Sequence, residues 1–218
     1  MKKIKELYTI RFNKKEREKK NRLWKIVCSD FFQRYIGKSS TVLDLGAGFC
    51  EFINNINCQN KYAVDINEEI RNFANEDVRT IITSGTDMKD IRDSSIDFVF
   101  ASEFFEHLKS IEELFATFLE IHRILKKDGR FIVLCPNIRY LQDRYWDFID
   151  HRLPLSHVSM REALLLYNFK VIKIVPKFLP YTTKSLLPKS PILLKIYLKL
   201  PAIWNFIGKQ MLIIAQKD

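Results

Sequence analysis

Glu103, Glu106 and His107 stand at the spacing E-x-x-E-H in the segment SEFFEHL, directly after an apolar run. If this segment begins a helix, Glu103 and Glu106 share a face and His107 lies one turn from Glu103. A histidine beside acids can remove a proton from a hydroxyl, so we predict His107 as a catalytic base and Glu106 as its partner. Two alternatives stay open: a structural role, and a Mg²⁺ or Mn²⁺ site formed by the same three side chains, with His151 or His157 as a fourth ligand.

The stretch VLDLGAGFCEFI, residues 42–53, combines a short apolar strand with a glycine turn. Turns that bind dinucleotide phosphates have the pattern G-x-G-x-x-G, but counting from Gly46 places Glu51 at the third glycine position. The carboxylates of Glu51 and Asp44 would repel a phosphate there, because like charges interact strongly at low dielectric. The turn is therefore predicted to bind a cationic ligand without phosphate, and S-adenosylmethionine, with its sulfonium and ammonium groups, fits this description.

Further positions are predicted to contact the same cofactor. Asp65 closes the second apolar strand and is placed to accept hydrogen bonds from ribose hydroxyls, although DINEE also resembles a helix cap. Asp87 is placed to accept from an adenine amino group and Met88 to pack on the ring, unless their segment is an ordinary loop. The complete predicted cofactor set is Asp44, Gly46, Ala47, Gly48, Asp65, Ile66, Asp87, Met88 and Glu103.

An aromatic segment, residues 138–158, is the predicted substrate loop. Flat aromatic faces interleaved with charged side chains suit a sugar ring that stacks on an aromatic and is held by polar contacts. A lid packed on the protein core is the alternative. The predicted substrate contacts are Tyr140, Arg144, Tyr145, Trp146 and His151.

The elements that must position these residues alternate between short apolar strands and helices, which is typical of a parallel α/β sheet. Leu23, Val27 and Phe31 form the apolar face of a helix that precedes the first strand. Ser159 is expected to cap a later helix. Strands are expected at 40–46, 61–67, 78–86, 96–104, 129–137, 170–176 and 210–217, and helices at 14–36, 49–56, 68–74, 111–125 and 159–169.

The composition suits one domain in a reducing compartment. The 218 residues are 47% hydrophobic, enough for a single buried core. The four cysteines show neither a CxxC pair nor zinc-finger spacing, so we interpret them as packing thiols. The N-terminal residues are charged rather than apolar, and no run of apolar residues is long enough to span a bilayer, so a cytoplasmic protein is expected.

The charge is distributed unevenly. Residues 1–20 contain nine Lys/Arg and three Asp/Glu, residues 21–150 contain sixteen and twenty-one, and residues 151–218 contain eleven and two. Basic ends indicate contact with nucleic acid, an anionic membrane or an anionic substrate, or simply a solvated surface. The apolar, basic segment 177–209, which Pro201 should kink, is expected to lie in an anionic membrane interface, with core, dimer face or pocket wall as alternatives.

Five motifs in order along the chain resemble those of class I S-adenosylmethionine-dependent methyltransferases: VLDLGAG, AVDIN, SGTDM, IDFVFASEFFEHL and LKKDGRFIVLCPN. Cys50 departs from the family's glycine-rich pattern. The resemblance implies a Rossmann-like, mostly parallel seven-stranded sheet with helices on both faces, formed by residues 41–218 after an N-terminal helical extension at 1–40. The segments 136–157 and 177–185 are similar to a bacterial subgroup associated with surface-polysaccharide assembly.

The resulting functional expectation is methyl transfer from S-adenosylmethionine to a hydroxyl of a glycan, a sugar intermediate or a lipid-linked precursor, without a bound metal. The protein would be cytoplasmic, with peripheral contact at the inner membrane face. One alternative is methylation of RNA or another macromolecule, because the basic ends favour phosphate backbones, although no RNA-binding module is visible. The other alternative is a cofactor-binding interaction protein without catalysis.

Overall fold

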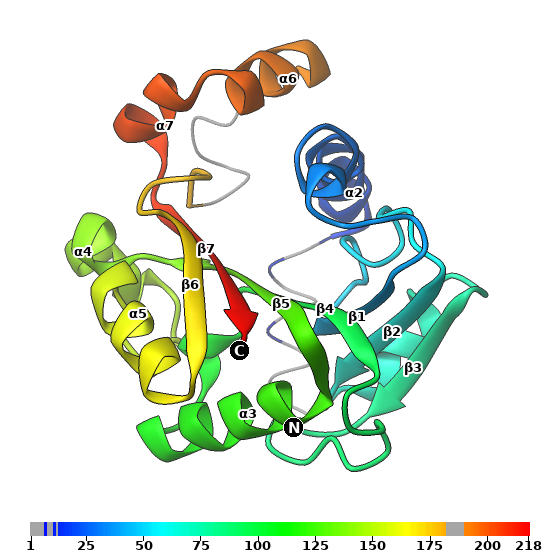
Figure 1. Ribbon diagram of the computed structural model, residues 1–218. Coiled ribbons are helices and arrows are strands. Elements are labelled where there is room, and N and C mark those ends of the chain that lie inside the picture. The colour runs from blue at the N-terminus through cyan, green and yellow to red at the C-terminus, as the bar shows by residue number, and fades with distance from the viewer. Residues whose placement is uncertain (1–6, 8–10, 12, 182–189) are drawn as a thin grey trace.

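The computed structural model describes residues 7, 11, 13–181 and 190–218. At its centre, seven strands form one sheet in the order β3-β2-β1-β4-β5-β7-β6, and within the described residues only β7 runs antiparallel to its neighbours (Figure 1). The predicted α/β fold with a mostly parallel sheet is confirmed. The strands are β1 (Thr41–Leu45), β2 (Asn60–Asp65), β3 (Val78–Ile82), β4 (Ile96–Ser102), β5 (Leu125–Pro136), β6 (Phe169–Val175) and β7 (Gln210–Lys217).

One face of the sheet is covered by two helices that connect consecutive strands, α3 (Ile111–Ile124) and α5 (His157–Leu166). Their apolar sides pack on strand residues that point to this face, such as Val99 and Phe131. The N-cap of α5 is Ser156, whereas Ser159 was predicted. Ser159 lies one turn later and closes a capping box with Ser156.

The opposite face is covered by α2 (Lys14–Asp30), α6 (Pro191–Lys199) and α7 (Pro201–Ile207) (Figure 1). The buried residues of α2 are Leu23, Val27 and Cys28. An aromatic cluster joins this helix layer to the sheet: the rings of Phe32 and Phe100 lie 5.1 Å apart, and Phe100 stacks on Phe52 at 3.7 Å. The N-terminal helical region is therefore part of the core that surrounds the sheet.

Two predicted helices are absent or reduced. Residues 49–56 form successive turns, because Cys50 has a left-handed backbone and the side chain of Asn54 bonds the backbone of Phe73 and Asn75. Residues 68–74 contain only a short 3-10 helix. The 3-10 helices are η1 (Phe32–Arg34), η2 (Glu68–Asn72), η3 (Phe105–His107) and η4 (Gln142–Asp147), and α4 (Ile138–Leu141) is a single turn of α-helix.

The segment 177–209 has an inner side that belongs to the core. Tyr197 donates a hydrogen bond to the carbonyl of Phe178, and the indole N–H of Trp204 donates to the carbonyl of Tyr197 at 2.8 Å. Pro201 begins α7 directly after α6 ends, as the predicted kink requires. Residues 182–189 of this segment lie outside the described residues. Among the described helices, none has the length and apolarity needed to cross a bilayer.

Candidate active site

The carboxyl ends of β1 and β4 mark the point where the strand order reverses, which is where open α/β sheets bind ligands. The glycine turn follows β1 at this point. Gly46 has φ +70°, and a Cβ there would lie 2.6 Å from the Phe104 ring. Gly48 has φ +53°, and its amide faces the carboxylate of Asp65. Both glycines therefore suit the left-handed backbone of the turn, and Ala47 between them is buried.

Cys50 occupies the third small position of the turn in a left-handed conformation, with φ +58°. Glycine is the usual residue for this conformation, and another residue costs about 1–2 kcal/mol there. The thiol is fully buried, and Sγ lies 3.9 Å from the carbonyl oxygen of Ile70. The departure from the glycine-rich pattern thus preserves the turn geometry, and the side chain fills space below η2.

Asp65 is held at the end of β2 by two backbone amides. Gly48 N–H donates to one carboxylate oxygen at 2.9 Å, and Asn67 N–H donates to the other at 2.8 Å. Burial raises the pKa of this carboxyl group, and both amide hydrogen bonds oppose the rise. Each carboxylate oxygen has a second lone pair available. Contact with ribose hydroxyls stays a prediction that this placement permits.

Three acidic residues lie close to the glycine turn. Asp44 is buried, and its pKa is raised well above the ordinary value, mainly by burial and then by the charges of Glu51 and Asp65. Glu51 is also buried, with one oxygen 3.3 Å from Lys20 Nζ. Three acids whose mutual repulsion is only partly offset by one lysine fit a ligand with positive centres, as S-adenosylmethionine has, better than a phosphate.

Three other predicted cofactor positions lie in different surroundings. Ile66 is exposed directly after β2. Asp87 is exposed and lies 3.2 Å from Lys89 Nζ. Met88 was expected to pack on the adenine ring, but its side chain is fully buried in the core, and its backbone bonds Glu120 and Arg123. The expectation for Met88 is wrong because the apolar residue of this loop points inward, and it anchors the loop to α3.

Glu103, which follows β4, does not share a helical face with Glu106. Its φ of +53° breaks the chain direction, and only residues from Phe105 onward form η3. The Glu103 carboxylate accepts a hydrogen bond from Gln210 Nε2 at 2.5 Å. Burial raises the pKa of Glu103 to about 7, with Lys20 and Gln210 opposing the rise. The two acids of the E-x-x-E-H pattern therefore lie in different surroundings.

Glu106, His107 and His151 come together instead. One ligand atom of each residue lies within 4.8 Å of the other two. Burial, followed by the charge of Glu103, raises the pKa of Glu106 well above its ordinary value. Burial lowers the pKa of both histidines, to about 4 for His151. The alternative metal set predicted from sequence is thus corrected: His151 takes the place of Glu103 because the backbone turns at Glu103.

Two residues that sequence reasoning did not assign support His107. Its Nδ1 lies 3.0 Å from the carbonyl oxygen of Asp150 and 3.5 Å from a carboxylate oxygen of the same residue. Arg11 donates to both carboxylate oxygens of Asp150, at 2.9 and 2.6 Å. Arg11 and Asp150 are 139 positions apart, so the only sequence signal was the complementary charge of the N-terminus and the middle of the chain.

The first turns of α2 lie near the glycine turn. Arg17 packs its guanidinium at 5.3 Å from the ring centres of both Phe49 and Phe73, and Lys20 pairs with Glu51. Together with the Arg11 contact to Asp150, these interactions connect the N-terminal segment to both sides of the site. Basic residues of the N-terminus therefore have partners within the chain itself.

The predicted substrate loop divides into buried and exposed parts. Tyr145 is fully buried and donates to the carbonyl of Leu153 at 2.5 Å, so its predicted substrate contact is wrong: the hydroxyl fixes the loop to the core. Trp146 is 51% exposed, and Arg144 is exposed beside it. Tyr140 is half-buried and stacks on His157 at 5.8 Å.

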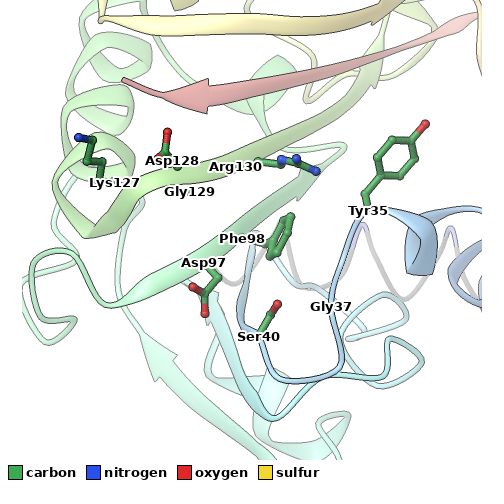
Figure 2. Close-up of a pocket in the computed structure, with 9 residues that line it drawn as sticks. All are labelled: Tyr35, Gly37, Ser40, Asp97, Phe98, Lys127, Asp128, Gly129 and Arg130. Atoms are coloured by element: carbon green, nitrogen blue, oxygen red, sulfur yellow. The ribbon is translucent and has the colours of Figure 1, made fainter.

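A shallow pocket lies at the other edge of the sheet, by the amino ends of β1 and β4 (Figure 2). Its lining includes Tyr35, Gly37, Asp97 and Phe98 together with residues 127–130. Asp97 already accepts from the backbone amide of Thr41 at 2.8 Å and from Lys126 at 2.8 Å. The carboxylate of Asp97 thus stabilises the fold. The pocket lies at the opposite ends of the strands from the glycine turn.

Comparison with known proteins agrees with this geometry. Residues 43–133 match the family model described as a methyltransferase domain. No curated protein sequence matches the chain. An S-adenosylmethionine-dependent methyltransferase from Thermotoga maritima aligns with 96% of this chain and 98% of its own, at 17% identity and a TM-score of 0.68. For one from Archaeoglobus fulgidus the values are 85%, 90%, 23% and 0.65.

A third similar structure is geranyl diphosphate C-methyltransferase from Streptomyces coelicolor in complex with Mg²⁺, geranyl diphosphate and S-adenosyl-L-homocysteine. It aligns with 87% of this chain and 78% of its own, at 19% identity and a TM-score of 0.61. At such identities the likeness shows the fold, and the family match covers the strands that carry the glycine turn, Asp65 and Glu106. Residues 43–133 therefore resemble a methyltransferase domain in sequence, and the chain has the fold of the S-adenosylmethionine-dependent methyltransferases named above.

Proposed function

We propose that this chain transfers a methyl group from S-adenosylmethionine to a hydroxyl of a glycan, a sugar intermediate or a lipid-linked precursor. The observation that carries the proposal is the cluster in which Glu106 and His107, after β4, meet His151 from the loop that also exposes Trp146. A proton-accepting group suits methylation of a weakly acidic sugar hydroxyl, and an exposed aromatic ring can stack on a sugar.

His107 is the proposed base in the metal-free chain. A backbone carbonyl only accepts hydrogen bonds, so the contact with Asp150 makes Nδ1 the protonated nitrogen and leaves Nε2 with a lone pair. Burial keeps the imidazole neutral near pH 7, because it lowers the pKa of His107 below the ordinary value. The cofactor supplies an electrophilic methyl group, and His107 takes up the proton that the acceptor hydroxyl loses.

Trp146 is the proposed platform for the acceptor. Its ring lies 5.2 Å from that of Tyr145, whose ring lies 4.8 Å from His151, so a chain of aromatic contacts links the exposed surface to the cluster. Arg144 can donate hydrogen bonds to sugar oxygens on the same exposed side. The intrachain partners of Arg11 and Lys20 weigh against RNA as the acceptor, because those basic groups are already engaged.

The proposal is tested by incubating the full chain with methyl-labelled S-adenosylmethionine and separate fractions of polysaccharide, lipid-linked saccharide and RNA. Label is expected in a saccharide-containing fraction, with loss of transfer in His107→Gln and weaker acceptor binding in Trp146→Ala. His122→Gln is the matched control, because His122 lies on α3 against Phe169. Label in RNA would favour the macromolecular alternative, and cofactor binding without any transfer would favour a non-catalytic protein.

We further propose that α6 and α7 rest on an anionic membrane from which a lipid-linked acceptor is taken. Their outer side exposes Ile192, Leu193, Ile196 and, most of all, Phe206, which is 82% exposed. Residues 190–207 contain two lysines and no acidic residue. An apolar face with basic groups and no acids complements an anionic lipid surface.

The membrane proposal predicts that the protein co-sediments with phosphatidylglycerol-containing liposomes at low salt and less so with neutral ones. Phe206→Ser combined with Ile192→Ser should release it. Leu166→Ser is the control, since Leu166 is 65% exposed on α5, which covers the opposite face. Equal sedimentation with neutral and anionic vesicles, or equal release by the control, would contradict the proposal.

A further inference from the structure

Two buried polar atoms in the cluster have no hydrogen-bond partner within the described structure: Oε1 of Glu106 and Nδ1 of His151. Glu106 is fully buried, and His151 is 93% buried, its exposed fraction being 7%. Buried polar atoms are nearly always paired, so two unpaired atoms in one cluster indicate that a ligand belongs between them. The other carboxylate oxygen of Glu106 is contacted by the Cys135 thiol at 3.6 Å, which orients the carboxylate.

Each histidine offers one ring nitrogen to a ligand. His107 gives its Nδ1 proton to the carbonyl of Asp150, which leaves Nε2 with a lone pair. The Nδ1 atom of His151 has no hydrogen-bond partner within the described residues, so it is available as a ligand atom. A histidine whose other ring nitrogen donates to a backbone carbonyl is the usual arrangement of a metal ligand.

We propose that Glu106, His107 and His151 bind one divalent transition-metal ion of the Zn²⁺ or Mn²⁺ kind, in a site with two histidines and one carboxylate. The donor atoms are Glu106 Oε1, His107 Nε2 and His151 Nδ1. Two imidazole ligands favour such ions over Mg²⁺, which prefers oxygen ligands and keeps most of its water. The ligand set differs from the one that spacing alone suggested, because His151 replaces Glu103.

The surroundings of the cluster support such a site. The Asp150 carboxylate lies 3.5 Å from His107 Nδ1 and is itself fixed by Arg11, which forms the second layer that orients a metal-binding imidazole. The side chain of His107 is 26% exposed, whereas Glu106 and His151 are buried. Among the three proposed ligands, His107 is therefore the one through which the site meets solvent in the described part of the chain.

The catalytic role of the metal ion rests on the proposed function, whereas the binding of the ion does not. An ion held here would coordinate the acceptor hydroxyl and lower its pKa, so that the proton leaves to solvent and His107 serves as a ligand instead of a base. The chain's own residues then fix the ion, and the methyl donor binds separately at the glycine turn.

The test measures metal binding on the full chain after treatment with a chelator. Calorimetry with Zn²⁺ and Mn²⁺ should give one site, and Co²⁺ should give a visible absorption spectrum typical of nitrogen and oxygen ligands. His151→Gln and Glu106→Gln should each weaken binding about 10-fold to 100-fold, as loss of a metal-site residue does. Far-UV circular dichroism establishes that each variant is folded, and Cys135→Ser serves as a milder variant should Glu106→Gln unfold.

His157→Gln and His122→Gln are the matched controls and should bind metal as the unaltered chain does. Less than one bound ion in the unaltered chain, or an unchanged affinity in His151→Gln, would overturn the inference. Binding of S-adenosylmethionine is measured in parallel. Metal binding without cofactor binding would contradict the proposed function alone, and cofactor binding without metal binding would contradict this inference alone.

Discussion

The two faces of the sheet are covered by helices of different origin. On one face, α3 and α5 connect neighbouring elements of the strand and helix alternation. On the other face, α2 comes from before the first strand, and α6 and α7 come from the connection between the last two strands. Periodicity predicts the first arrangement well. The second depends on contacts between distant parts of the chain, which periodicity does not reveal.

The second face is organised this way because the local connections there are too short to cover it. Residues 49–56 form turns, and residues 68–72 form only η2. Aromatic rings fill the space that remains: Phe31 contacts Phe178 at 4.4 Å, and Phe178 contacts Trp204 at 4.9 Å. Large side chains from three distant segments thus replace the helices that the alternation leaves out.

The largest expected effect tests whether both faces contribute equally to the core. Phe118→Ala on α3 and Phe32→Ala below α2 each remove a fully buried ring, so each should lower the free energy of unfolding by about 3–5 kcal/mol. Urea denaturation measures both. If Phe32→Ala costs less than about 1 kcal/mol while Phe118→Ala costs the full amount, the second face is a loosely attached layer.

The next comparison lies within α7. Trp204→Ala should cost about 3 kcal/mol, because it removes a buried ring and the hydrogen bond to Tyr197. Phe206→Ala, two residues later, should stay within about 0.5 kcal/mol, because that ring is exposed. Thermal denaturation of the two variants distinguishes them. Similar losses would mean that the outer side of α7 is covered in solution.

A smaller difference in stability is expected between variants of the two glycines in the turn after β1. Gly46→Ala combines left-handed strain with a clash against Phe104, so we expect a loss of about 2–3 kcal/mol and weaker cofactor binding. Gly48→Ala has the strain without the clash, since the added Cβ would lie 3.9 Å from its nearest neighbour, the carbonyl oxygen of Gly46, and should cost about 1 kcal/mol. Calorimetry with the cofactor follows binding, and equal losses would remove Phe104 from the explanation.

The smallest expected loss of stability comes from replacing the residues that cap a helix on each face. Asn13 caps α2 and Ser156 caps α5, each in a capping box. Replacing either by alanine should cost about 1 kcal/mol. Denaturation curves of Asn13→Ala and Ser156→Ala test whether the start of α2 folds together with the rest. A negligible loss for Asn13→Ala alone would show that the first turn of α2 frays.

Sequence reasoning located the glycine turn, Asp65 and the segment that carries Glu106 and His107, because each follows a strand whose apolar pattern is clear. It misplaced Met88 and Tyr145, since sequence does not show whether an apolar or aromatic loop residue points inward. His151 was named only as an additional ligand. Its arrival beside Glu106 depends on the left-handed turn at Glu103, which no residue type in SEFFEHL signals.

The buried thiol of Cys28 can be used to measure how often α2 separates from the sheet. Burial raises the pKa of Cys28, and Sγ lies 3.7 Å from the carbonyl oxygen of Phe52, so the closed protein shields it from thiol reagents. The rate at which a disulfide reagent labels Cys28 therefore measures how often α2 separates from the sheet. If α2 and the glycine turn open together, cofactor bound at the proposed site should slow this labelling, and Cys28 then reports opening of the active site.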